Sequence, residues 1–305
     1  MSHPFEDHLR KIHQIISLED GDREPYINIY NEIRDALLNE ICEADLTFKQ
    51  LYAGHRCGES VTIGRYMHKV CLKKPNEFDV FFILKMPYGH KLTISKDKKR
   101  PGFVRLGLRR VLPSMPSTIN LNFLLKSAIL IEKIIEFSIS TPVSSWYAVP
   151  NPLKNKRLDC PGNSFQLINP NMEDERLSVG SLHVGVVYRL VKSLRDRNQI
   201  RKLTNTFLVS IFLWETKKRP DNFWQKPISE VFLEILKVLL THIQTRKLPY
   251  FWNPEHNLIH TLEDEEVASY ATALDLLFCL LQAYRDQSSL AFHDCARLFR
   301  LLHKV

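Results

Sequence analysis

Two carboxylates stand at the start of an apolar run, Glu77-Phe-Asp79-Val-Phe-Phe82, directly after the turn-like segment Lys73-Lys-Pro-Asn76. Such a run is typical of a β-strand, and residues i and i+2 of a strand point to the same face. Glu77 and Asp79 therefore project together and repel each other unless a cation lies between them. Proteins commonly hold Mg²⁺ through one or two carboxylates and the phosphates of a substrate. The pattern predicts metal-assisted phosphoryl or nucleotidyl transfer, and two incidental acids on a solvated strand end are the alternative.

The elements around this strand divide the chain into a mixed first part and a helical second part. Apolar residues near a 3.6-residue period predict a long helix over 26–46, and strands are predicted over 61–73, 77–85 and 103–108. A predicted helix over 121–131 leads into a strand that carries Glu136. After residue 171 the pattern is helical over 172–197, 199–215, 226–245, 264–284 and 288–303. The chain is therefore predicted to be α+β, with a loop-rich segment over 149–163.

Composition narrows the class of protein. Hydrophobic residues make up 44% of the 305 residues and charged residues 25%, which is ordinary for a globular protein. The start of the chain lacks the basic and apolar regions of a signal peptide, and no membrane span is expected. The six cysteines are scattered, without a Cys-x-x-Cys pair, so we expect reduced thiols, a cytoplasmic location and no structural zinc. The aromatic residues of the helical part are predicted to fill its core rather than stack on bases.

The net charge of +8 is unevenly distributed. Residues 1–50 hold five Lys or Arg and eleven Asp or Glu, whereas residues 65–110 hold thirteen Lys or Arg and three acids. A second basic run covers residues 189–202. Such runs predict contact with a phosphate backbone, and an ordinary solvated surface is the alternative. The candidate nucleic-acid-binding residues are Lys96, Lys98, Lys99, Arg100, Arg195 and Arg197.

Three segments in order resemble one known family. The segment Gly64-Arg65-Tyr66 through Asp79 is similar to a glycine turn that leads into an acid-x-acid strand. The segment 165–175 is similar to a Trp-Arg-Leu-Ser-Phe element that runs into an acidic helix start. The segment Lys247-Leu-Pro-Tyr-Phe-Trp-Asn-Pro-Glu-His-Asn-Leu258 is similar to a C-terminal signature. On these residues the chain resembles the cyclic GMP-AMP synthase and male-abnormal-21 (Mab-21) family, with an insect-type member as the nearest kind.

The resemblance implies a two-lobed nucleotidyltransferase fold of the polymerase-β type. A mixed twisted sheet with a long N-terminal helix would form residues 1–175, and an all-helical lobe would form residues 176–305. It also implies a nucleic-acid-activated innate-immune enzyme that joins ATP and GTP into a cyclic dinucleotide, with double-stranded RNA as a possible activator. Mg²⁺ or Mn²⁺ would be held by the catalytic carboxylates Glu77, Asp79 and Glu136. Nucleotide would contact Gly64, Arg65, Gln166 and Lys192.

Several positions depart from the family pattern and predict impaired catalysis. Arg65 stands where the family has a phosphate-holding serine, and Glu136 is one methylene longer than the usual aspartate. Gln166 and Ile168 stand where the family has nucleotide-contacting arginine and serine, and Leu208-Val209-Ser210 lacks the lysine of a Val-Lys-Thr element. Each lost charge removes a charge-assisted contact to phosphate. A non-catalytic protein that keeps the fold and acts through partner contacts is therefore the alternative.

Overall fold

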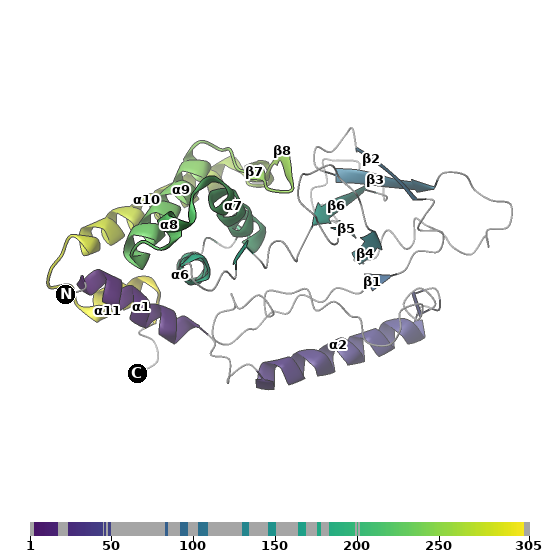
Figure 1. Ribbon diagram of the computed structural model, residues 1–305, viewed down its shortest axis with the longest axis horizontal. Helices are drawn as coiled ribbons and strands as arrows, with labels where there is room; N and C mark the ends of the chain where they lie inside the picture. The colour runs from purple at the N-terminus through teal and green to yellow at the C-terminus, as the bar shows by residue number, and fades with distance from the viewer. Residues whose placement is uncertain are drawn as a thin grey trace. The chain divides into compact units, whose positions relative to one another are not determined.

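The computed structural model describes residues 3–17, 24–44, 46, 48–49, 83–84, 92–96, 103–108, 130–133, 146–150, 164–168, 176–177, 183–198, 200 and 202–301. Figure 1 labels its helices and strands. The chain forms two compact units. The helical unit comprises Met1–Arg23, Arg65–Asn76 and Glu173–Val305, and the sheet unit comprises Glu24–Gly64 and Glu77–Met172.

The sheet unit holds one long helix and a mixed sheet. The helix α2 (Glu24–Ala44) confirms the helix expected over 26–46. The described strands are β1 (Ile83–Leu84), β2 (Leu92–Lys96), β3 (Phe103–Leu108), β4 (Leu130–Lys133), β5 (Trp146–Pro150) and β6 (Ser164–Ile168). Their order is β1-β4-β5-β6-β3-β2, in which β1 and β4 are parallel and the other neighbours antiparallel. Neighbours β4–β5, β5–β6 and β3–β2 are consecutive among the described strands, whereas β1–β4 and β6–β3 join strands that are farther apart in the sequence.

The strand over 103–108 was expected with these bounds, whereas two other segments differ from expectation. The end of the predicted helix over 121–131 is the start of β4, and the predicted loop over 149–163 begins within β5. Both segments combine apolar and β-branched residues without a clear helical period. Short apolar runs of this kind fit a strand as well as a helix, and pairing with neighbouring strands decides between them.

The helical unit contains α1 (Pro4–Ile16), α6 (Val184–Arg197), α7 (Asn205–Lys218), α8 (Asp221–Trp224), α9 (Ile228–Gln244), α10 (Asp264–Arg285) and α11 (Phe292–Leu298). A short hairpin of β7 (Pro249–Tyr250) and β8 (Asn253–Asn257) precedes the 3₁₀ helix η3 (Leu258–Thr261). The helices α6, α7, α9, α10 and α11 confirm the helical pattern read after residue 171. The helices α7, α9 and α11 begin later than expected, whereas α7 and α10 extend beyond their expected ends.

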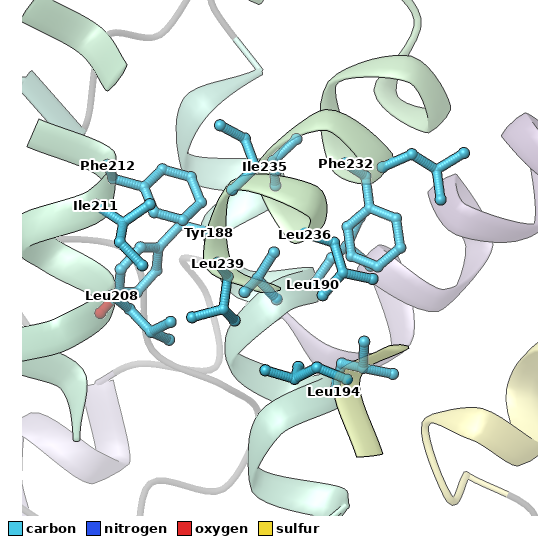
Figure 2. Packing of buried hydrophobic residues seen from close by; sticks show 14 of the residues in the cluster. Tyr188, Leu190, Leu194, Leu208, Ile211, Phe212, Phe232, Ile235, Leu236 and Leu239 are labelled. Carbon is cyan, nitrogen blue, oxygen red and sulfur yellow. The ribbon is translucent and has the colours of Figure 1, made fainter. Parts of the chain in front are cut away.

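The core of the helical unit lies between α6, α7 and α9. Figure 2 shows Tyr188 and Phe212 facing each other, with Leu236 and Leu239 of α9 packed among them. The Tyr188 and Phe212 rings meet edge to face with centroids 5.1 Å apart, and Phe212 also lies 6.2 Å from Trp224. Phe212, Trp224 and Phe232 are buried, as the sequence predicts, whereas Trp214 remains partly exposed.

The N-terminal helix α1 belongs to this helical core. Phe5, Leu9 and Ile12 are fully buried, and their spacing of four and three residues gives α1 one apolar face. That face packs against α6, α9, α10 and α11, and Figure 1 shows α1 in purple beside α11. The division expected at residue 175 places these first residues with the sheet, so the structure differs from it here. The sequence interpretation did not include α1 at all.

The buried carboxylate of Glu6 on α1 accepts hydrogen bonds from the first turn of α9. The Glu6 oxygens accept hydrogen bonds from the backbone N–H groups of Ile228, at 3.1 Å, and Ser229, at 2.7 Å. These donors belong to the first turn of α9, where N–H groups have no partner within the helix and negative charge is favoured. Arg10 also pairs with Glu6 at 2.7 Å. Glu6 therefore caps a helix that lies more than 200 residues away in sequence.

The helix α10 is long and apolar enough by composition to cross a membrane. In the structure Val267, Leu274, Leu277 and Leu281 of this helix are buried in the core of the helical unit. A capping box of Glu263 and Glu266 also begins the helix, with three acids in its first turn. One side of α10 therefore contacts the core, whereas Leu276 (61% exposed) and Leu280 (43% exposed) lie on its exposed side.

Candidate phosphate-binding site

Most of the predicted catalytic site lies outside the described residues. The structure does not describe the predicted metal ligands Glu77, Asp79 and Glu136. It also does not describe Gly64, Arg65, Lys98, Lys99 and Arg100. The two strands that adjoin the acidic segments, β1 and β4, are parallel neighbours with Ile83 opposite Leu130. In sequence, however, Asp79 precedes β1 whereas Glu136 follows β4. The roles of Glu77, Asp79 and Glu136 as metal ligands therefore stay predictions.

Two predicted site residues lie on described strands. Gln166 is the middle residue of β6, and its backbone is opposite Phe103 of β3 and Val149 of β5. The strand β6 lies inside the described sheet, between β5 and β3. Lys96 is the last residue of β2, the strand at one edge of the described sheet. Their roles in binding stay predictions.

The helix α6 carries the remaining predicted residues. Lys192, the predicted nucleotide-binding lysine, is half-buried, and Arg197 in the last turn is exposed. Arg189 lies one turn before Lys192 on the same face, because residues three apart are neighbours on a helix surface. The opposite face of α6 is apolar and buried, with Val187, Leu190 and Leu194 in the core. The packing of that face thus fixes the direction in which the cations project.

Arg195 has a structural role rather than the surface role that its place in the basic run suggested. Only 6% of its surface is exposed. Its guanidinium donates to the backbone oxygen of Leu203 and to Oδ1 of Asn205, both at 2.8 Å, and it pairs with Asp196. These contacts tie the end of α6 to the turn that begins α7. A side chain committed in this way is not available to a nucleic-acid backbone in this structure.

A histidine from α1 contacts the basic face of α6. The Nε of Arg189 donates to Nε2 of His13 at 2.8 Å, and the Ser17 hydroxyl lies 2.9 Å from the same nitrogen. Since an arginine N–H can only donate, Nε2 carries no proton and accepts both bonds. Burial and the neighbouring Arg189 charge lower the pKa of His13 from 6.5 to about 4. The ring is therefore neutral at pH 7.

The lowered pKa of His13 predicts a specific acid sensitivity. The unfolded chain takes up a proton at His13 near pH 6.5, whereas the folded chain resists it until about pH 4. The free energy of unfolding should therefore fall as the pH drops from about 6.5 to 4. Urea unfolding between pH 4 and 8 measures this slope, and His13→Gln, which cannot titrate, should flatten it. An identical slope in the variant would contradict the lowered pKa.

The C-terminal signature has a structural centre at Asn257, which the sequence interpretation quoted without a role. Its Oδ1 accepts from the backbone N–H of Leu248 at 2.8 Å and of Ile259 at 3.2 Å, and its Nδ2 donates to the Arg246 oxygen at 2.8 Å. Arg246 has a φ of 55°, which is costly for a residue with a side chain. One amide therefore holds a strained turn, the β7–β8 hairpin and the start of η3 together.

Removal of the Asn257 amide should destabilise this hairpin. We expect Asn257→Ala to lower the free energy of unfolding by about 2–3 kcal/mol, because three backbone groups lose their partner. Asn257→Asp, which keeps the acceptor and loses only the donor to Arg246, should cost less. Guanidinium unfolding of both variants gives the comparison. An alanine variant as stable as the native chain would exclude this structural role.

Comparison with known proteins finds one domain match and several relatives. The Mab-21 protein HhH/H2TH-like domain matches residues 184–276, which run from the start of α6 into α10. A Drosophila melanogaster protein named cyclic GMP-AMP synthase-like protein is 23% identical over 355 residues, covering 97% of this chain and 98% of the relative. The chain thus carries a match to a Mab-21 domain and is similar over most of its length to a cyclic GMP-AMP synthase-like protein. A Mab-21 domain implies a nucleotidyltransferase-like fold, and the presence of a mixed sheet and a helical unit is compatible with it.

Other relatives of this chain carry receptor names. The cyclic GMP-AMP synthase-like receptor of Lucilia cuprina is 20% identical and covers 83% of this chain and 86% of the relative. That of Nicrophorus vespilloides is 32% identical over 116 residues, which are 37% of this chain and 30% of the relative. The similarity is thus long but low in some relatives, and shorter but higher in others.

Proposed function

We propose that this chain is a weak cyclic dinucleotide synthase that uses ATP and GTP and responds to double-stranded RNA. The match over nearly all of a cyclic GMP-AMP synthase-like protein carries this proposal. It is supported by the Glu77-x-Asp79 pair ahead of β1 and by Lys192 on the half-exposed face of α6.

In this proposal the chain's own groups divide the work. Glu77 and Asp79, with Glu136 as the proposed third acid, would hold Mg²⁺ or Mn²⁺, which when bound neutralises phosphate charge and helps activate the ribose hydroxyl. Lys192 would hold a phosphate, because a lysine ammonium donates charge-assisted hydrogen bonds to phosphate oxygens. Gly64 would allow the backbone to approach the nucleotide. Lys96, Lys98, Lys99, Arg100 and Arg197 would contact RNA phosphates.

The weakness of the proposed catalyst follows from its departures from the family pattern. Arg65, Gln166, Ile168 and Val209 replace residues that would contact phosphate or base. Loss of one electrostatic contact to a transition state commonly costs about a hundredfold in rate. Several such losses, combined with the longer Glu136, should bring turnover close to background.

Incubation with ATP, GTP, Mn²⁺ and double-stranded RNA should therefore give little cyclic dinucleotide, measured by mass spectrometry against an internal standard. Asp79→Asn should remove that product entirely, because it deletes one of the proposed metal ligands. Arg65→Ser with Gln166→Arg should raise ATP and GTP affinity first. Abundant product from the native chain would contradict the prediction of impaired catalysis. Product that persists in Asp79→Asn would contradict the proposed metal site.

The second candidate is a non-catalytic protein that keeps the fold and acts through partner contacts. The observation that favours it is Gln166 on the interior strand β6, where the family pattern has an arginine. An uncharged amide cannot replace the charge-assisted contact of a guanidinium to phosphate. Complete absence of product in the assay above, with intact RNA binding, would favour this candidate.

A further inference from the structure

The outer side of α10 carries apolar residues that the core of the helical unit does not use. Leu276 is 61% exposed and Leu280 is 43% exposed, although Leu274, Leu277 and Leu281 of the same helix are buried. Only 22% of the most apolar 18-residue window of α10 is buried. Core packing therefore accounts for one side of this helix and does not account for the apolar character of the other.

The two exposed leucines belong to a continuous stripe along α10. Residues three or four apart are neighbours on a helix surface, and exposed residues follow one another at this spacing on both sides of Leu276. We call these residues the outer stripe: Ser269, Thr272, Leu276, Cys279, Leu280 and Ala283. The stripe contains no Asp, Glu, Lys or Arg and extends over about 21 Å at 1.5 Å per residue. A long exposed surface without charge is typical of a contact site.

The charges of α10 narrow the kind of partner that can cover this stripe. The helix holds four acids, Asp264, Glu265, Glu266 and Asp275, and one cation, Arg285. This excess of acids repels a phosphate backbone or an anionic lipid surface, and helices that lie on membranes are rich in lysine and arginine instead. The whole chain has a net charge of +8. A second copy of this chain therefore offers both an uncharged stripe and an overall charge opposite to that of α10.

The two ends of α10 favour an antiparallel orientation of two copies. The first turn holds three acids, whereas Arg285 in the last turn pairs with Asp286 at 3.0 Å, so that end carries little net charge. A parallel pair would place acidic turns side by side, and like charges in contact are costly. An antiparallel pair avoids this repulsion and brings opposite ends of the helix dipoles together.

We propose that the outer stripe of α10 is a self-association surface through which two copies of this chain form an antiparallel, two-fold symmetric dimer. Such a contact must be complementary to itself. A two-fold axis between Leu276 and Leu280 pairs each leucine with the other leucine of the second copy, and the small residues Ser269 and Ala283 at the ends let the helices approach. One helix pair buries much less than the about 800 Å² per partner of a standard interface, so the dimer is reversible. Its formation needs neither nucleotide nor metal and is independent of the proposed activity.

Sedimentation equilibrium of the full chain between about 1 and about 300 µM, without nucleotide, tests the dimer. The average mass should rise from 35.7 kDa toward twice that value. Leu276→Glu places an acid of each copy beside the axis and should weaken association about tenfold or more. Ile15→Glu is the matched control, because Ile15 on α1 is also an exposed apolar residue, and it should change association less than about twofold. A single-chain mass at every concentration, or equal losses in the two variants, would overturn the surface.

A thiol crosslink tests the symmetry of the pair. With the axis between Leu276 and Leu280, the two Cys279 side chains lie at the same edge of the contact, and Cys279 is exposed. A short bismaleimide should therefore link two copies at concentrations where the dimer forms. Cys279→Ser should remove this product, and so should Leu276→Glu. The same yield of linked chains in Cys279→Ser would contradict the antiparallel arrangement.

Two further measurements distinguish a second copy from other partners. The melting temperature of Leu276→Glu should stay within about 2 °C of the native value, as expected for a change at an exposed position. A large fall would mean that another part of the same chain covers Leu276, and would overturn the proposal. Binding to vesicles of phosphatidylcholine and phosphatidylserine that is lost in Leu276→Glu would assign the stripe to a lipid surface and overturn it as well.

Discussion

Replacement of Leu9 by alanine should destabilise the helical unit by about 3–4 kcal/mol, although Leu9 lies in the first helix of the chain. Its side chain is fully buried between α1 and the C-terminal helices. Removal of buried methyl groups costs their transfer free energy plus a penalty for the cavity that remains. Tryptophan fluorescence in urea measures the effect, because Trp214, Trp224 and Trp252 all belong to the helical unit.

Ile15 provides the matched control on the same helix. It is 40% exposed, so Ile15→Ala should lower the free energy of unfolding by less than about 1 kcal/mol. The pair separates the burial of α1 from its helix propensity, since both changes introduce the same residue into α1. Equal and small effects of the two changes would mean that α1 does not dock on the C-terminal helices in solution.

The second large effect is expected at Arg195. Arg195→Leu should destabilise the chain by about 2–4 kcal/mol, because Leu203 and Asn205 lose their donor and Asp196 loses its partner. Arg197→Leu, two residues along the same helix, removes the same charge from an exposed position and should leave stability nearly unchanged. Thermal unfolding of the two variants makes the comparison.

The affinity for RNA should fall in the Arg197→Leu variant and not in the Arg195→Leu variant, which is the reverse of their expected effects on stability. Arg197→Leu should weaken binding of double-stranded RNA and reduce its salt dependence, since each phosphate contact contributes to that dependence. Arg195→Leu, measured well below its melting temperature, should bind RNA like the native chain. A loss of RNA affinity at Arg195 without loss of stability would restore the surface role that the basic run suggested.

Periodicity was enough to locate most of the helices. The amphipathic pattern over 26–46 and the helical pattern after residue 171 correspond to α2 and to the helices α6 to α11. Each of these signals is local, because a helix satisfies its own backbone hydrogen bonds and needs one apolar face. The strand β3 was equally clear from alternation. The short strands β4 and β5 were not, since a strand is completed only by neighbours that are remote in the sequence.

The sequence did not predict which cations of the basic run are buried. The run of cations over 189–202 gave no indication that Arg195 is inside the core while Arg197 is outside. Residues two apart on a helix differ by about 200° around the axis, so the facing surface decides which one is buried. The acid-x-acid pair and the C-terminal signature pointed to the Mab-21 family without alignment of the whole chain.

By itself the sequence determined the α+β class, the helical second half and the resemblance to Mab-21 proteins, because these depend on local periods and on motifs that survive low identity. Only the tertiary structure decided which partners the polar groups take. Glu6 caps α9, His13 orients Arg189, and Asn257 holds the turn at Arg246. The first two contacts join residues more than 170 positions apart, and the third depends on a strained turn. Such contacts arise only when packing of apolar faces has brought their helices together.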